Sequence, residues 1–288
     1  IVPSLTYIAS ATCIDLVGAK PKFIEVEELY YTLDPKALEA AISNTTKAII
    51  AVHLYGQPVS ESIFKIASKY GIPVIEDAAQ GHGGWLNGKR IGSFGDIATF
   101  SFFPSKNMSV GGDGGAIVTN REDLIERLST FVDHGRTSKY RSEQLGTNFR
   151  LSEIQCAIGR IQLKHLDRWV ERRNEIATRY NTAFSNIKHI TTPKNRPGST
   201  HAWNQYTIRV RGRESFQAHM SRRNISTSIH YPIPIHLQPL YSHHPQGNKG
   251  TLPLTENICE DIVSIPVMPL LTDEEVEHII ASVQSWEP

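Results

Sequence analysis

Between residue 1 and about residue 120, short apolar runs of strand length alternate with longer segments of helical periodicity. This alternation is typical of an α/β domain, because helical crossovers bring successive strands back in parallel. We predict an α/β fold with a mostly parallel central sheet, helices on both faces and a small α+β domain at the C-terminal end. The expected strands span residues 22–26, 48–54, 73–76, 97–102 and 116–119.

The helices expected between these strands have recognisable ends. Asp34 followed by Pro35 is typical of an N-cap and a first helical position, and Gly71 is expected to end a helix over residues 60–70. A further helix is expected from residue 122 to residue 133, ending near Gly135.

The sequence of the second half predicts a connecting helix followed by a smaller domain. Apolar residues recur at helical spacing from residue 152 to about residue 184, which indicates one long helix. A strand over residues 206–210, a helix over 214–223, a second strand ending at Tyr231 and a terminal helix opened by a capping box at Thr272 follow. The predicted division is a large domain over residues 1–150, a connecting helix over 151–185 and a small domain over 186–288.

The overall charge gives no indication of a polyanionic partner. Lys and Arg total 30 against 29 Asp and Glu, so the net charge is +1, and we expect no nucleic-acid binding. No run approaches the roughly 18 apolar residues that a membrane span requires, so no membrane segment is expected.

The three cysteines, Cys13, Cys156 and Cys259, are far apart in the sequence. Their odd number argues against a disulfide framework and favours a cytoplasmic protein. The 12 histidines are scattered and do not lie near a cysteine or carboxylate cluster, so no metal site is expected.

An acidic residue ends one of the predicted strands. The sequence Ile-Glu-Asp-Ala-Ala-Gln at residues 75–80 runs from an apolar strand into acids and small residues. Ligands of open α/β sheets bind beyond the carboxyl ends of the strands, where a carboxylate such as Asp77 can keep a pyridine nitrogen protonated. The alternative is a carboxylate that caps a helix or turn.

Lys106 follows an aromatic strand and a proline turn, in the sequence Phe-Ser-Phe-Phe-Pro-Ser-Lys-Asn at residues 100–107. A lysine in a protected place loses its proton more easily than an exposed one and can attack an aldehyde. The alternative is an ordinary surface lysine. Ser101 can supply a hydroxyl to a phosphate, and the glycine run at residues 111–115 is expected where backbone turns sharply or approaches a ligand.

The order and spacing of these features resemble the DegT/DnrJ/EryC1/StrS family of sugar aminotransferases, and the resemblance extends over nearly the whole chain. It implies a PLP-dependent transferase of fold type I, the aspartate aminotransferase type, with pyridoxal 5′-phosphate (PLP) as cofactor. Further resembling segments are residues 3–7, 53–58, 133–136, 146–151 and 230–236.

By this resemblance, Lys106 is the Schiff-base lysine that binds PLP and moves protons during catalysis. Asp77 pairs with the pyridine nitrogen, Gln80 contacts the side of the ring that carries the 3-hydroxyl, Ser101 binds the phosphate and Tyr7 stacks on the ring.

The resemblance also implies a homodimer with shared active sites, because Asn148 reaches the phosphate of the neighbouring subunit in this family. His230, Tyr231 and His236 are expected to meet the substrate, with packing of a Pro-rich loop as the alternative.

The implied reaction transfers an amino group, from glutamate in most of the family, to a nucleotide-linked keto-sugar. A family branch that dehydrates sugars has histidine at the lysine position, and Lys106 argues against that branch. A non-catalytic or regulatory protein with the same fold is the other alternative. The family normally has a helix-rich segment with a Gly-Thr or Gly-Ser phosphate-binding turn before the strand that begins here, so we expect the chain to begin partway through the large domain.

Overall fold

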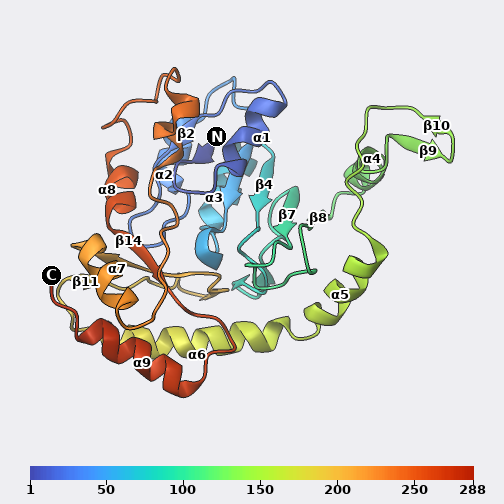
Figure 1. Ribbon diagram of the computed structural model, residues 1–288. Helices are drawn as coiled ribbons and strands as arrows, with labels where there is room; N and C mark the ends of the chain where they lie inside the picture. The colour runs from blue at the N-terminus through green and yellow to red at the C-terminus, as the bar shows by residue number, and fades with distance from the viewer.

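A four-stranded sheet forms the centre of the N-terminal half in the computed structural model, which describes residues 1–288 (Figure 1). The strands follow the order β3–β4–β7–β8. β3, β4 and β7 are parallel, and β8 is antiparallel to β7 at the edge, so the predicted mostly parallel sheet is confirmed. The bounds are Ile49–Val52, Val74–Asp77, Ile97–Ser101 and Gly115–Val118.

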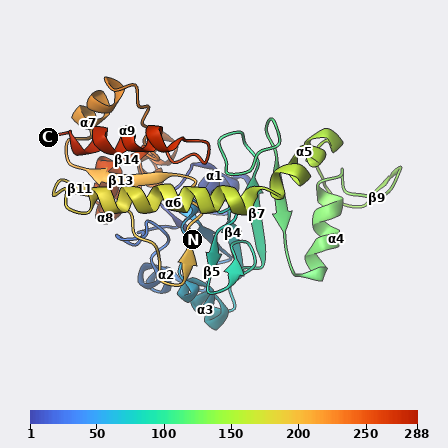
Figure 2. The same cartoon turned by 90° about the horizontal axis from the view of Figure 1, so that it is seen from below.

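A short parallel pair, β1 with β2, lies beside this sheet. The N–H of Ile50 in β3 donates to the carbonyl of Ile1 at 2.9 Å, which places the start of the chain next to β3. Helices α1, α2 and α3 flank these strands (Figures 1 and 2). The bounds are Val2–Pro3 for β1, Phe23–Ile24 for β2, Ala9–Leu16 for α1, Pro35–Ala41 for α2 and Glu61–Tyr70 for α3.

The predicted helix ends of this half are confirmed. The Asp34 carboxylate accepts the N–H groups of Lys36 and Ala37, and Pro35 occupies the first helical position of α2. Gly71 ends α3 with φ 65°, a left-handed conformation that glycine adopts without strain.

The glycine run at residues 111–115 serves packing of the sheet. A Cβ on Gly115 would lie 2.7 Å from the carbonyl oxygen of Phe100 in β7, and a Cβ on Gly114 would lie 2.9 Å from the Leu151 side chain. The close approach seen here is to a neighbouring strand and a side chain of the protein, and the expected approach to a ligand stays a prediction.

Residues after β8 form an arm that projects from the rest of the molecule (Figure 1). The expected helix over residues 122–133 is present as α4, and it is slightly shorter than predicted. A small antiparallel pair, β9 with β10, follows. The bounds are Glu122–Phe131 for α4, Arg136–Ser138 for β9 and Arg141–Ser142 for β10.

Residues 151–185 form two helices, α5 and α6, so the prediction of one continuous helix is wrong. At the break, the N–H groups of Lys164 and His165 bond to carbonyls three residues back, at 3.1 and 2.9 Å, which tightens the turn. Because of the bend, α5 packs against Val110, whose side chain would lie 3.3 Å from a Cβ placed on Gly159. α6 packs on the C-terminal core (Figure 2). The bounds are Glu153–Leu163 and Leu166–Phe184.

The C-terminal part contains an antiparallel sheet in the order β11–β13–β14. The prediction of a strand that ends at Tyr231 is wrong. In this segment only Ser228 forms a β-bridge, to Ser264 of β14. β13 lies between β11 and β14, and the four residues of β14 are all buried. The bounds are Ile190–Thr191, Tyr206–Val210 and Ile262–Ile265.

Helices α7, α8 and α9 complete this part, and α9 lies beside α6 in both views (Figures 1 and 2). The predicted capping box is confirmed: Thr272 Oγ1 accepts the Glu275 N–H, and the Glu275 carboxylate accepts the Thr272 N–H. The bounds are Arg213–Ser221, Pro253–Asp261 and Asp273–Gln284.

Two large apolar clusters hold the chain together. One lies between α6, α9 and the C-terminal sheet, and includes Tyr180, Tyr206 and Trp286. The other joins side chains near β1 and β3 to Ile235 and Ile258 from the C-terminal part. The contacts of Ile235 and Ile258 show that residues after 186 pack on the N-terminal half as well as on the C-terminal half. The predicted domain division near residues 150 and 185 stays a prediction.

The remaining elements are short. A three-stranded sheet in the order β12–β5–β6 brings residues from the C-terminal part next to the N-terminal half. None of the helices combines the length and the apolarity that a membrane crossing requires. The bounds are Trp85–Leu86, Lys89–Arg90 and Ser199–Thr200 for β5, β6 and β12, and Leu54–Gly56, Ile235–Leu237 and Pro239–Tyr241 for the 3₁₀ turns η1, η2 and η3.

Candidate active site

The carboxylate of Asp77 stands at the carboxyl end of β4, in the middle of the parallel sheet. Its Oδ2 accepts a hydrogen bond from the Ser10 hydroxyl at 2.7 Å, and its Oδ1 accepts the Ala79 N–H at 3.1 Å. Two donors from different elements therefore orient this carboxylate. A fixed anion at this position suits a ligand with a cationic ring nitrogen.

Lys106 lies in the turn after β7, the strand next to β4. Its N–H donates to the Phe103 carbonyl at 2.9 Å, which closes the turn. Burial lowers the pKa of the Lys106 amine, and the Asp77 carboxylate partly opposes this by favouring the charged form. The two predicted residues are thus close enough to interact, and Lys106 loses its proton more readily than a surface lysine.

Two histidines lie close enough to Lys106 to respond to its charge. Burial, and secondly the charge of Lys106, lower the pKa of His230 and lower that of His82 to about 4. His82 packs edge-on against Phe100, with ring centroids 5.1 Å apart, and neither of its ring nitrogens has a hydrogen-bond partner. Sequence reasoning placed His230 here and missed His82, although His82 follows Gln80 by only two residues.

Gln80 connects two sides of the site. Its Oε1 accepts the Tyr55 N–H at 2.5 Å, and its Nε2 donates to the Tyr231 hydroxyl at 3.1 Å. The Tyr231 ring lies 5.8 Å from the Tyr7 ring, centroid to centroid, and the Tyr55 hydroxyl donates to the His230 carbonyl. The structure therefore brings Tyr7, Gln80 and Tyr231 together, and it adds Tyr55, to which the sequence assigned no role.

Ser101 ends β7, beside the turn that carries Lys106. Its Oγ accepts the Phe103 N–H at 3.3 Å, so the hydroxyl proton stays free to bond an anion. Asn148 is different: it is exposed and forms a β-bridge with Asp133, which follows α4 in the projecting arm, and its Oδ1 accepts from Arg150 Nε at 2.9 Å. Within one chain, Asn148 does not join the other candidate residues.

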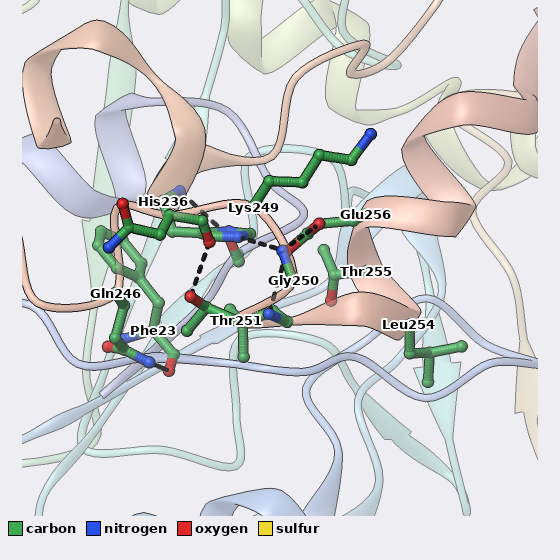
Figure 3. Close-up of polar contacts among 12 residues, drawn as sticks. Phe23, His236, Gln246, Lys249, Gly250, Thr251, Leu254, Thr255 and Glu256 are labelled. Carbon is green, nitrogen blue, oxygen red and sulfur yellow. Dashed lines mark hydrogen bonds and ion pairs between the residues drawn. The ribbon is translucent and has the colours of Figure 1, made fainter.

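His236 lies in the interior of the protein with no exposed surface (0%). Its Nδ1 is 2.6 Å from Ser4 Oγ, and its Nε2 is 3.1 Å from Glu256 Oε1. Glu256 also accepts the Gly250 N–H at 2.9 Å (Figure 3). This burial argues against the predicted contact of His236 with the substrate, and its contacts instead join segments far apart in the sequence.

The sequence profile of the DegT/DnrJ/EryC1/StrS aminotransferase family matches residues 1–284. The chain belongs to this family. It is an enzyme of the aminotransferase class with the PLP-dependent aminotransferase fold, in a family that uses PLP.

Relatives within the DegT/DnrJ/EryC1/StrS family include enzymes and a protein named as a regulator. A dTDP-3-amino-3,6-dideoxy-alpha-D-galactopyranose transaminase from Aneurinibacillus thermoaerophilus is 45% identical over 289 residues, which cover 99% of this chain and 78% of the relative. A pleiotropic regulatory protein from Geobacillus stearothermophilus is 40% identical over 290 residues, covering 99% and 77%. The crystal structure of S. venezuelae DesV in complex with a ketimine intermediate is 39% identical, with a TM-score of 0.96 over 99% of this chain and 77% of DesV.

The side chains at this site fit the cofactor of the DegT/DnrJ/EryC1/StrS family. PLP needs an anion for its pyridine nitrogen, an amine for its aldehyde and a donor for its phosphate. Asp77, Lys106 and Ser101 offer these three groups at the ends of the adjacent strands β4 and β7. No group of three or more His, Cys, Asp or Glu side chains has an arrangement that could hold a metal ion.

Proposed function

We propose that the protein transfers an amino group from glutamate to a nucleotide-linked keto-sugar, with PLP bound covalently by Lys106. One observation carries this proposal: burial lowers the pKa of Lys106, and the lysine lies within electrostatic range of the Asp77 carboxylate. An amine that loses its proton more readily than a surface lysine and a carboxylate at neighbouring strand ends are the two groups that PLP chemistry needs most.

When bound, PLP supplies an aldehyde that links to amines and a ring that withdraws electrons from the attached carbon. Asp77 holds the pyridine nitrogen in its protonated form, which makes the ring more electron-withdrawing. Lys106, released when the amino group of the donor takes its place on the cofactor, would act as general base for the α-proton of the donor, a role for which its lowered pKa suits it. Ser101 donates its hydroxyl to the phosphate.

The aromatic residues of the site surround the proposed ligands. Tyr7 would stack on the ring of the cofactor, and Gln80, which donates to Tyr231, would contact the side that carries the 3-hydroxyl. Tyr231 and His230 meet the acceptor sugar. Burial raises the pKa of Tyr231 to about 12, so its hydroxyl stays protonated near neutral pH and can donate to a sugar oxygen.

The relatives support a nucleotide-sugar acceptor. The Aneurinibacillus protein is named as a dTDP-amino-sugar transaminase, and it matches almost the whole of this chain. We transfer the substrate class of that relative to this protein, but not its particular sugar or nucleotide. A cytoplasmic location stays a prediction.

We also propose a homodimer in which Asn148 reaches the phosphate site of the partner subunit. The arm that carries Asn148 exposes large apolar side chains, which soluble proteins usually cover by association. Burial of this arm against a second copy would explain both the exposed side chains and the separation of Asn148 from the other candidate residues. The exposed apolar residues of the arm include Ile125, Phe131, Leu145 and Phe149.

A regulatory protein without turnover is the second candidate, because one relative is named as a pleiotropic regulatory protein. The test is to add glutamate to the full-length protein loaded with PLP and to follow the visible absorbance of the Lys106-bound cofactor. The enzyme is expected to lose this absorbance and to aminate a member of a nucleotide keto-sugar panel, with the product identified by mass spectrometry and NMR. Unchanged absorbance with glutamate would support the regulatory protein.

A further inference from the structure

We propose that Ser10 is a positioning residue that fixes the Asp77 carboxylate and thereby strengthens the hold of the site on the pyridine nitrogen of the cofactor. This inference rests on the proposed function and assigns a role to a residue that the sequence did not indicate. It is carried by two linked hydrogen bonds, one buried and one partly buried, that end on Asp77.

The bond between Ser10 and Asp77 is short and partly buried. Ser10 lies in the first turn of α1 and is 5% exposed. Its Oγ donates to Asp77 Oδ2 at 2.7 Å, and a hydroxyl bond to a charged oxygen at this distance is among the stronger hydrogen bonds in proteins. It links two segments that are 67 residues apart in the sequence.

The number of available protons decides which atom is the donor in each of the two linked hydrogen bonds. Ser10 has one hydroxyl proton, and a carboxylate oxygen can only accept, so this proton goes to Asp77. The Thr6 Oγ1 atom, 3.0 Å from Ser10 Oγ, must then be the donor to Ser10. Thr6 is itself buried, with 4% exposure. The polarity runs from Thr6 through Ser10 to Asp77, and each bond polarises the next.

The second oxygen of Asp77 is also held. Its Oδ1 accepts the Ala79 N–H at 3.1 Å, from the backbone that follows β4. With one donor on each oxygen, rotation of the carboxylate about its last bond breaks at least one hydrogen bond. Both bonds hold the carboxylate in one orientation, from which it can pair with a protonated pyridine nitrogen.

Ser10 also couples Asp77 to the residue predicted to stack on the ring. The Ser10 N–H donates to the Tyr7 carbonyl at 3.1 Å, so both residues belong to one turn at the start of α1. The same turn therefore places a hydroxyl on the carboxylate and carries the aromatic ring. A shift of this turn would move both contacts to the cofactor together.

The test compares PLP binding to the apo forms of the full-length wild type, Ser10→Ala and Ser10→Cys, followed by the absorbance of the Lys106-bound cofactor. Loss of one hydrogen bond to a charged group is expected to weaken PLP binding about 3- to 10-fold in Ser10→Ala. Ser10→Cys keeps the side-chain shape with a weak donor, and it is expected to resemble Ser10→Ala. Ser185→Ala, which removes an exposed hydroxyl bonded to the Thr182 carbonyl, is the matched control and should bind PLP as the wild type does.

A double-mutant cycle separates positioning of Asp77 from a general structural effect. If Ser10 acts through Asp77, Ser10→Ala should weaken binding by less than about 2-fold in an Asp77→Ala background. Thr6→Val, which removes the donor to Ser10, should weaken binding in the same direction by a smaller factor, and it provides a second test if Ser10→Ala folds poorly.

An equal loss in both backgrounds, or wild-type affinity of Ser10→Ala, would overturn the inference. A wild type that shows no absorbance of Lys106-bound cofactor would overturn the proposed function instead.

Discussion

The Gln80 side chain donates to the Tyr231 hydroxyl at 3.1 Å, while its own carbonyl oxygen accepts the Tyr55 N–H at 2.5 Å. Both the oxygen and the nitrogen of the Gln80 amide therefore make hydrogen bonds within the protein, and the Tyr231 oxygen accepts one of them. Because burial raises the pKa of Tyr231 to about 12, its proton remains available for a ligand. This arrangement turns Tyr231 into an oriented donor.

Replacement of Tyr231 by Phe should weaken acceptor binding more than PLP binding. The ring contact with Tyr7 is kept in this variant, but the oriented hydroxyl and its hydrogen bond to Gln80 are lost, so the KM for the acceptor is expected to rise about 3- to 10-fold. Steady-state kinetics with the acceptor found in the panel would measure this. Tyr70→Phe, at an exposed position at the end of α3, is the control. A normal acceptor KM in Tyr231→Phe would contradict the role.

Replacement of His236 by Ala should reduce the stability of the protein. The variant removes the imidazole ring that hydrogen-bonds to both Ser4 and the buried Glu256, so the free energy of unfolding is expected to fall by about 2–4 kcal/mol. Denaturant unfolding would measure the change. If His236 contacted the substrate, as the sequence predicted, the variant would instead keep its stability and lose acceptor affinity.

The stability of the protein should fall in acid, in part through Glu76. Burial opposes ionisation of this carboxyl, but His53 and the N–H groups of Gly95 and Gly92 outweigh burial and hold its pKa below the ordinary value of 4.5. A lowered folded-state pKa gives stability that is present above pH 4.5 and is lost as the pH falls through the folded-state value. Glu76 thus contributes to this loss only below pH 4.5.

Urea unfolding at a series of pH values would test this, with Glu76→Gln as the comparison. The variant is expected to be less stable at neutral pH and to lose less stability than the wild type between about pH 4.5 and pH 3. Parallel pH profiles of the two proteins would show that Glu76 does not contribute to acid sensitivity.

Two glycines of the same run should respond differently to replacement by alanine. A Cβ at Gly115 would meet the Phe100 carbonyl oxygen at 2.7 Å, whereas the nearest atom to a Cβ at Gly112 is 3.6 Å away. Gly115→Ala is therefore expected to destabilise the protein by about 1–3 kcal/mol, and Gly112→Ala by less than about 1 kcal/mol. Thermal unfolding of both variants would measure the difference, and equal losses would contradict the packing role of Gly115.

Signals that act over a few residues were readable in the sequence. The caps at Asp34, Gly71 and Thr272 depend on hydrogen bonds within one turn, and all three are present. The break after Leu163 and the pairing of β13 with β14 depend on what packs against these segments. Helical spacing continues across the break, so periodicity alone could not reveal it.

The site shows the same limit. Asp77 and Lys106 stand out because each follows an apolar strand, and the sheet places such strand ends together. Ser10, Tyr55 and His82 are common residue types, and only the folded chain brings them to the site. His236 shows the same limit from the other side, since its motif gave no sign that the side chain is fully buried, and its substrate contact stays a prediction.

The central claim is that Lys106 holds the cofactor, and the most direct test is to locate the covalent link. The full-length protein loaded with PLP would be reduced with borohydride, digested and analysed by mass spectrometry, with Lys106→Ala treated in the same way. We predict one pyridoxyl-modified peptide, with the modification on Lys106, and no such peptide from the variant. Modification of another lysine, or none in the wild type, would contradict the claim.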